Sequence, residues 1–489
     1  MDFLSQKNKR NLCCFLLCVA LSIVAWVILH DANWILGDDE LFLRTTAMGR
    51  PSHAWTGQGR FWPLGLCDYS ILLALPFELT VQVHLVYNII MMVASVLLMF
   101  NILNKITDNS YGISLFTMAT FLLSVSFVQI HMSCIYPERC MFFMQTLFMY
   151  CWYKAKTDNS VIFYALAFIF ASYVIFSKEP AFGMIAAIAL THLIFNRKQI
   201  DVKEKCFCCS LMFSSIAYLA IYVYRWFFRD HRADGVYGNT GTIFASNVDV
   251  INVVKLIIEN NPLLILIFVL GAIRAYYVVI KSDTKTIWID ALLFGGMAYS
   301  FAYFLLAFTN DYYSFPTVVF AMPSLAYWIY HFVVNKKIMT IIAVSCTAIL
   351  TGFSIPKSVD HVLFNLNARK NDMPTIEFIA EQHLKGVPVL MYTNGIDINM
   401  FRYDRVRGED FAFKVYRYFI NYVLYQEKSN NRNIVVPVER INNLPEHCVL
   451  LCHKSVETSK KQQLINDGFK LIYSNNVYVA DYGVETYMR

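Results

Sequence analysis

Three adjacent acids follow the first apolar run of the chain, and arginines come soon after them: Asp38, Asp39, Glu40, Arg44, Arg50 and Arg60. A carboxylate can act as a general base toward a hydroxyl group. Arginine and lysine can neutralise the charge of a departing phosphate. This stretch therefore contains the residue types that transfer of a group from a phosphate to a hydroxyl requires.

Charged and phenolic residues recur between later apolar runs. They are Glu138 and Arg139 in CIYPER, Lys178 and Glu179 in FSKEPAFG, the basic group from Arg225 to Arg232, and Asp311, Tyr312 and Tyr313 in TNDYYSF. Charges that persist beside a membrane usually mark function. We expect Arg60, Arg139 and Lys178 to hold a phosphate. Glu138 and Glu179 would orient these cations, and the further candidates for substrate binding are Arg44, Asp311 and Tyr312.

Each group also has a purely structural interpretation. The three acids are compatible with a solvated cap after a span, and Glu138 and Arg139 with a structural ion pair. Lys178 and Glu179 precede a proline that can start the next helix. Tyr312 and Tyr313 suit the aromatic belt of a membrane interface. The gathering of all these groups on one side of the bilayer, as the span assignment implies, favours the functional interpretation.

The composition indicates an integral membrane protein. Of the 489 residues, 57% are hydrophobic and only 16% are charged, against about 25% charged in soluble proteins. The first apolar run is too long for a cleaved signal and lacks a small-x-small site before Asp31. The net charge of +6 comes without a basic-aromatic surface, so we expect no nucleic-acid partner. The 13 cysteines lie mostly in apolar runs and predict no disulfide framework.

We predict eleven membrane spans, each near the roughly 20 residues that a helix needs to cross. They are 11–30, 83–103, 112–131, 139–154, 161–177, 181–196, 207–227, 262–281, 287–308, 316–334 and 338–355. With a cytoplasmic N-terminus, every cytoplasmic loop contains Lys or Arg, as the positive-inside rule requires. The short apolar segment 66–79 would break this alternation if it crossed, so we expect it to lie in the outer interface. Arg274 is close enough to the cytoplasmic end of its span to snorkel.

The composition changes after Ile355 to that of ordinary soluble sequence. We predict helices over 374–384 and 410–426, strands over 387–392, 434–438 and 449–453, and a hairpin over 470–482 with an Asn-Asn turn. The predicted fold is therefore mainly α. A polytopic helical bundle spans 1–355, with a first outer loop over 31–82, and a small extracytoplasmic α/β domain spans 356–489.

In this arrangement the chain resembles the GT-C membrane glycosyltransferases, which include protein O-mannosyltransferases and lipid A aminoarabinose transferases. The resemblance covers 1–355 at the level of architecture. Its motifs are the Asp39-Glu40 pair at the start of a long outer loop, the Gly59-Arg60-Phe61 segment and the Lys178-Glu179 turn. The resemblance implies that Asp39 is the catalytic base, and Asp38 is an equally good candidate. It also implies that Lys178 lies near the phosphate of a lipid donor.

The predicted activity is transfer of a sugar from a polyprenyl-phosphate donor to an acceptor hydroxyl at the outer membrane face, with inversion. Asp38, Asp39 and Glu40 are the candidate catalytic residues. We predict no cofactor, although the paired acids at 38 and 39 would also suit a divalent metal ion. The acceptor could be a lipid, a glycan or a protein. The compact loops and lack of disulfides suggest a bacterial inner membrane.

Two alternatives belong to different classes of protein. An O-antigen-type polymerase or ligase uses similar donors, but its key arginines usually lie in large loops late in the chain. A transporter or flippase of lipid-linked sugars would be non-enzymatic. Ion-coupled transport usually needs ionisable groups near mid-bilayer, and the predicted span centres are nearly free of charge.

Overall fold

The computed structural model describes most of the chain. The described residues are 6–33, 61–73, 81–132, 136–197, 199–225, 255, 259, 261–305, 311–392, 435–438, 440, 441, 444–454, 456–477 and 482–489. The candidate residues from Asp38 to Arg60 lie outside these ranges, as does the predicted helix over 410–426.

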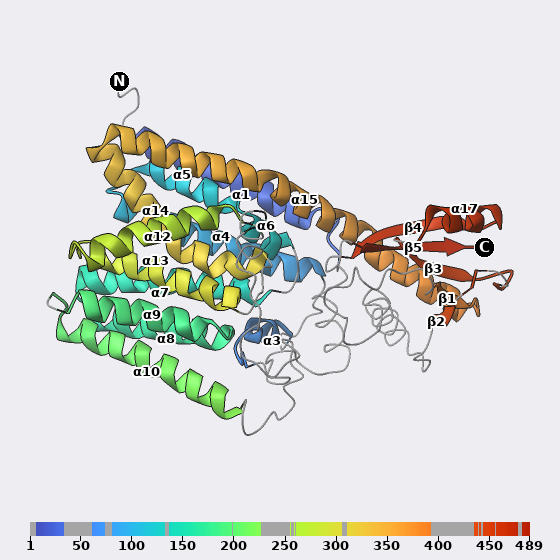
Figure 1. The fold of residues 1–489 in the computed structure, drawn as a ribbon, viewed down its shortest axis with the longest axis horizontal. Helices are drawn as coiled ribbons and strands as arrows, with labels where there is room; N and C mark the ends of the chain where they lie inside the picture. The colour runs from blue at the N-terminus through green and yellow to red at the C-terminus, as the bar shows by residue number, and fades with distance from the viewer. Residues whose placement is uncertain are drawn as a thin grey trace.

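A bundle of helices forms the larger part of the molecule (Figure 1). Its helices are α1 (Gln6–Leu29), α4 (Val81–Ile106), α5 (Tyr111–Leu122), α6 (Val125–Met132), α7 (Pro137–Asp158), α8 (Val161–Ser177), α9 (Ala181–Phe195), α10 (Val202–Tyr224), α12 (Leu263–Val279), α13 (Ile287–Leu305), α14 (Phe315–Asn335) and the long α15 (Lys337–Leu384). Each predicted span overlaps one of these helices or, for 112–131, α5 and α6 together. Among the described residues, six helices are long and apolar enough to cross a membrane, or seven if α5 and α6 form one bent span. The membrane-helix fold class is confirmed, and the number of spans stays a prediction.

The break between α5 and α6 is stabilised locally. The two helices meet at an angle of 61°. The Ser124 hydroxyl lies 2.7 Å from the Phe121 carbonyl oxygen, and Ser358 of α15 donates to the Leu123 carbonyl at 2.9 Å. Because lipid offers no hydrogen bonds, carbonyl groups released at a break must find partners inside the protein. These two serines allow the span to bend.

The helix α15 joins the two parts of the molecule. It contains 48 residues without interruption, which corresponds to about 72 Å at 1.5 Å per residue. Figure 1 shows it running along the bundle and continuing to the sheet. We predicted a boundary after residue 355 and a separate helix over 374–384 that starts at Pro374. That helix is instead the last part of α15, which tolerates Pro356 and Pro374 in its interior.

Arg369 fixes α15 to the bundle. Its guanidinium, on a residue only 1% exposed, donates to the carbonyl of Ile28 at 2.5 Å and to the carbonyl of Met132. These carbonyls belong to the last turns of α1 and α6, where helical partners are missing. One buried cation therefore satisfies two helix C-termini, which also favour positive charge.

The five-stranded sheet at the far end of α15 has the order β2-β1-β3-β5-β4. The strands are β1 (Val389–Tyr392), β2 (Val435–Val438), β3 (Val449–His453), β4 (Lys470–Val477) and β5 (Tyr482–Met488), and the helix α17 (Thr458–Asn466) follows β3. The strand β1 lies parallel to β2 and β3, whereas β5 is antiparallel to β3 and β4. The first three predicted strands are confirmed within two residues.

The predicted Asn-Asn turn is wrong. Asn475 and Asn476 lie within β4, paired with Val484 and Gly483 of β5. Asn475 is fully buried because it docks the sheet on α15. Its amide donates to Asp372 at 2.8 Å, and its oxygen accepts from Thr375 at 3.0 Å. A tertiary contact thus holds a turn-forming residue in a strand.

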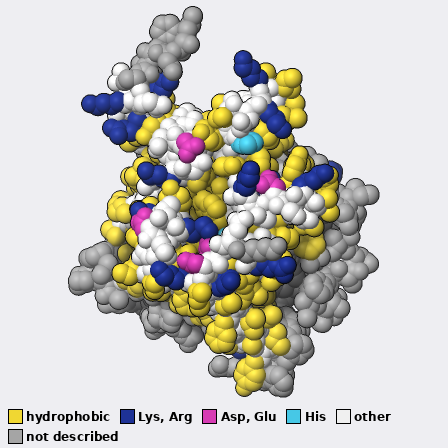
Figure 2. All heavy atoms as spheres, turned by 90° about the vertical axis from the view of Figure 1, so that its left-hand side faces the viewer, with side chains coloured by type: hydrophobic (Ala, Val, Ile, Leu, Met, Phe, Trp, Pro, Cys, Tyr) yellow, Lys and Arg dark blue, Asp and Glu magenta, His cyan; other side chains and the backbone are white. Residues whose placement is uncertain are grey.

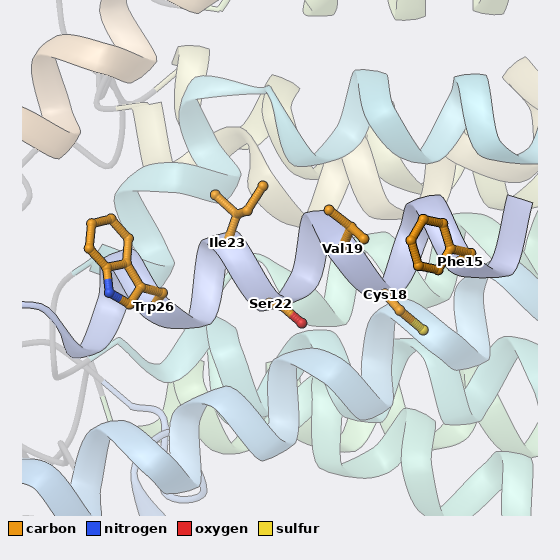
Figure 3. A pocket seen from close by; sticks show the side chains of 6 residues that line it. All are labelled: Phe15, Cys18, Val19, Ser22, Ile23 and Trp26. Atoms are coloured by element: carbon orange, nitrogen blue, oxygen red, sulfur yellow. The ribbon is translucent and has the colours of Figure 1, made fainter. Parts of the chain in front are cut away.

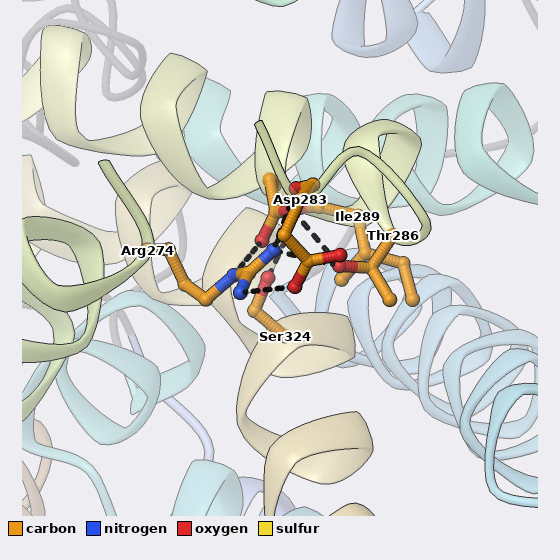
Figure 4. A network of polar contacts seen from close by, with 6 residues as sticks. Arg274, Asp283, Thr286, Ile289 and Ser324 are labelled. Atoms are coloured by element: carbon orange, nitrogen blue, oxygen red, sulfur yellow. Dashed lines mark hydrogen bonds and ion pairs between the residues drawn. The ribbon is translucent and has the colours of Figure 1, made fainter. Parts of the chain in front are cut away.

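Arg274 does not snorkel to the surface, contrary to our expectation. It is 1% exposed and binds both carboxylate oxygens of Asp290, at 2.9 Å from Nε and 2.8 Å from Nη2. Asp283 and Thr286 complete the cluster (Figure 4). The pairing removes the cost of a lone buried charge and ties α12 to α13.

Basic side chains gather at one end of the bundle. Figure 2 looks onto the end at the left of Figure 1, where Lys and Arg side chains surround the helix ends. This matches the bias predicted for cytoplasmic loops, and the orientation itself stays a prediction. The sides of the bundle are apolar, as the outer face of α1 illustrates (Figure 3). There Phe15, Cys18, Val19, Ser22, Ile23 and Trp26 line a shallow groove of about 470 Å³.

We expect Arg369→Met to lower the melting temperature in detergent. The variant keeps an apolar side chain of similar length but leaves two buried carbonyls without a donor. The loss of hydrogen bonds from a charged group costs about 1.5–3 kcal/mol each. Lys370→Met is the control, because Lys370 is an exposed neighbour on the same helix. Equal melting temperatures for the two variants would contradict the role given to Arg369.

Candidate active site

A buried ion pair lies at the end of the bundle that faces the sheet. Glu138 stands in the first turn of α7, which Pro137 begins, and Lys178 stands in the short turn between α8 and α9. The Lys178 Nζ lies 2.7 Å from the Glu138 Oε1, and the side chains are 5% and 0% exposed. The sequence identified both residues as candidates. We expected Glu138 to orient a cation, but the sequence could not tell which one, because Glu138 and Lys178 are 40 positions apart.

Aromatic rings enclose the Lys178 ammonium group. Its Nζ lies 5.5 Å from the ring centroid of Trp62, 5.6 Å from that of Tyr312 and 5.4 Å from that of Tyr313. Ring faces attract cations, more strongly where water is excluded. The cation therefore lies where four chain segments meet: the end of the first loop, the α7 start, the α8–α9 turn and the turn before α14.

The segment from Phe61 to Leu66 is tied down beside Lys178. The Leu64 amide donates to the Phe176 carbonyl at 3.0 Å, and the Tyr173 hydroxyl donates to the Leu64 carbonyl at 3.0 Å. At Gly65, a Cβ atom would lie 1.9 Å from the Trp62 ring and 2.9 Å from the Ser177 carbonyl oxygen. Glycine is needed there for the loop to pass so close to α8. The segment from Trp62 to Gly65 is thus anchored beside Lys178.

Arg139 provides a second buried cation, next to Glu138. It is 3% exposed, and its Nη2 donates to the Tyr69 hydroxyl at 2.6 Å. Tyr69 belongs to the short helix α3 (Cys67–Leu73) and stacks on His84 of α4, with ring centroids 4.5 Å apart. The predicted interfacial segment 66–79 thus contains a helix over 67–73, and its tyrosine holds Arg139 in place.

Asp68 is a site residue that the sequence analysis did not select. Its Oδ2 accepts from the Tyr87 hydroxyl at 3.1 Å, and its Oδ1 is buried. Desolvation raises the pKa of this carboxyl from 3.8 to about 6, against the opposing effects of Tyr87 and Arg139. The signal available in the sequence was an acid inside a short apolar segment of the first loop.

Asp311 contacts α15. It opens the 3-10 turn η2 (Asp311–Ser314), is 7% exposed, and its Oδ2 lies 3.1 Å from His361 Nε2 and 3.3 Å from Lys357 Nζ. These contacts favour a positioning role for Asp311, because they fix the turn that presents Tyr312 and Tyr313 to Lys178. Lys357 and His361 were missed because the sequence after 355 was interpreted as a soluble domain.

The structure brings part of the predicted site together. Glu138, Lys178 and Tyr312 meet, and Asp311 supports the tyrosines. Arg139, the next residue after Glu138, is buried and binds Tyr69, and Glu179 is buried at 7% exposure. The remaining candidates lie outside the described residues: Asp38, Asp39, Glu40, Arg44 and Arg60. Among the described residues, no group of three or more His, Cys, Asp or Glu side chains could hold a metal ion. The roles of the individual residues stay predictions.

No protein-family model matches the chain, and no curated protein matches it. Among solved structures, the chain is similar to ArnT from Cupriavidus metallidurans bound to undecaprenyl phosphate, with a TM-score of 0.47, 9% identity and 97% of each chain covered. It is also similar to the apo oligosaccharyltransferase of Archaeoglobus fulgidus, with a TM-score of 0.46, 10% identity, and 87% of this chain and 64% of that chain covered.

The raised pKa of Asp68 predicts a pH dependence of stability. The folded state holds this proton more tightly than the unfolded chain, whose carboxyl titrates near 3.8. The stabilisation is therefore present below that value and is lost as pH rises toward about 6. The asparagine in Asp68→Asn does not titrate, so the stability of this variant lacks the pH-dependent contribution of the carboxyl group. We expect the melting temperature of the variant, relative to wild type, to rise between about pH 4 and 7 and to level off above it. A difference that is constant with pH would contradict the assignment.

Proposed function

We propose that the chain is a membrane glycosyltransferase that moves a sugar from a polyprenyl-phosphate donor to an acceptor hydroxyl. The observation that carries the proposal is the buried Lys178–Glu138 pair inside its aromatic enclosure, at the end of the bundle and beside the returning first loop. A lipid-anchored phosphate would arrive at this depth, because its tail lies in the bilayer and its charge at the boundary.

Lys178 and Arg139 are the cations proposed to hold the donor phosphate. Each is almost fully buried, so each acts on an anion through a low dielectric that strengthens the interaction. Glu138 holds the Lys178 ammonium group in place before the donor binds. Its second oxygen, Oε2, has no hydrogen-bond partner among the described residues. Few hydrogen bonds therefore hold the Glu138 carboxylate, and it can move away from Lys178 when a phosphate binds the ammonium group in its place.

The proposed reaction is a direct displacement. The acceptor hydroxyl oxygen attacks the anomeric carbon of the sugar, and the bond between that carbon and the phosphate oxygen breaks. The bonding electrons leave with the polyprenyl phosphate, whose added charge Lys178, Arg139 and Arg60 balance. Asp39, or its neighbour Asp38, accepts the hydroxyl proton. Attack opposite to the leaving group inverts the anomeric configuration. The chemistry described needs no metal ion.

We expect Asp39→Asn or Asp38→Asn to abolish most of the transfer activity while the protein still folds. Loss of a general base lowers a rate by about 10²–10⁴. The measurement is transfer of labelled sugar from a synthetic polyprenyl-phosphate donor by the purified protein, with melting temperature as the folding control. Full activity in the double variant Asp38→Asn/Asp39→Asn would rule out this base.

Replacement of Lys178 tests the phosphate site. We expect Lys178→Met to lower kcat/KM for the donor by about 10²–10³, since loss of one charged group that stabilises the leaving group costs that much. The matched control is Lys156→Met. Lys156 also pairs with a buried glutamate, Glu204, at 2.6 Å, but at the opposite end of the bundle. Activity lost equally in both folded variants would indicate a general structural effect and not phosphate binding at Lys178.

A further inference from the structure

A second charged cavity lies at the basic end of the bundle, far from the Lys178 site. It has a volume of about 280 Å³ and lies between the last turns of α4 and α7. Lys105 from α4 and Lys154 from α7 line it, together with Tyr150, Tyr153 and Asp158. Figure 2 looks onto this end of the molecule. A water takes about 30 Å³, so the cavity has room for a headgroup and not only for a single ion.

The two lysines differ in how they are held. Lys154 lies 2.8 Å from Asp158, one helical turn along α7. Lys105 is exposed, and no hydrogen bond or ion pair joins it to another residue in the part of the chain that the structure describes. The cavity therefore contains one cation available to an anion and a second that an anion would share with Asp158.

An apolar strip leads along α4 toward this cavity. Val86, Ile90 and Leu97 are 45%, 60% and 46% exposed. Their spacing of four and seven residues places them on one face of the helix. The same face continues four residues on to Asn101, which lines the cavity, and then to Lys105. A fatty chain lying along this strip would bring its headgroup to the lysines.

We propose that this cavity binds the headgroup of an anionic phospholipid from the leaflet at the basic end. Lys105 and Lys154 would bind the phosphate. Tyr150 and Tyr153 are amphipathic rings of the kind that lie at headgroup depth. Basic pockets between helices are a recognised way to hold acidic lipid headgroups. The apolar strip favours a lipid over a free phosphate ion, although both present the same anionic group.

Native mass spectrometry of the purified full-length protein in detergent tests the proposal with phosphatidylglycerol and phosphatidylcholine as probes. We expect wild type to retain phosphatidylglycerol in preference to phosphatidylcholine. Each lysine near the membrane surface contributes about fivefold to the binding of an anionic lipid. Lys105→Gln/Lys154→Gln removes both and should therefore weaken phosphatidylglycerol binding by about 25-fold. Asp158→Asn should strengthen binding, because it releases Lys154 from its partner.

The matched control is Lys336→Gln/Lys337→Gln. These two exposed lysines join α14 to α15 at the same end of the bundle and do not line the cavity, so this variant should keep its preference for phosphatidylglycerol. Equal loss in both double variants would show a diffuse charge effect and overturn the proposal. Retention of both lipids alike would also overturn it. So would stabilisation by inorganic phosphate without preferential lipid binding, since the ligand would then be a soluble anion.

Discussion

The site depends on a charge held away from water. A lysine buried without a partner would lose its proton or draw in water, because the cost of desolvating an ion is several kcal/mol. Lys178 stays in place through Glu138 at 2.7 Å and through the rings of Trp62, Tyr312 and Tyr313. None of these partners is next to it in sequence. The bundle, the first loop and the turn before α14 must all be in position before this cation is stabilised.

The long helix α15 gives that arrangement its rigidity. Lys357 and His361 hold the turn that begins at Asp311, and Arg369 binds the ends of α1 and α6. Further along, Asp372 holds the sheet through Asn475. One helix therefore connects the tyrosines of the candidate site with the C-terminal domain.

Polar clusters inside the bundle follow one rule at both ends. Arg274 is neutralised by Asp290, and Glu204 accepts from Lys156 and lies 2.9 Å from His192. Each cluster joins neighbouring helices and has both signs of charge, as burial in a low dielectric requires. The Lys178 site obeys the same rule, and like Arg274, whose Cζ lies 4.4 Å from the Trp328 ring centroid, its cation contacts aromatic rings. What the Lys178 site adds is a cation contacted by three rings from two distant segments, together with the end of the long first loop. That combination separates a candidate reaction site from clusters that only hold helices together.

The sequence by itself determined the helical segments, the first three strands and the residue types of the site. Membrane spans and basic loops are local features: apolar runs of about 20 residues and the Lys and Arg between them can be recognised from the sequence without any tertiary contact. The resemblance carried by Asp39-Glu40 and Lys178-Glu179 also needed only local motifs.

Only the tertiary structure decided which of these residues meet. The continuity of α15 through Pro356 and Pro374, the burial of Arg274 and the position of Asn475 in a strand all contradict local preference. For Arg274 and Asn475, a partner on another element outweighs the local preference, because a buried polar group left without its hydrogen bond costs about 1–3 kcal/mol. The enclosure of Lys178 has the same origin, since its rings come from segments more than 100 residues away on either side.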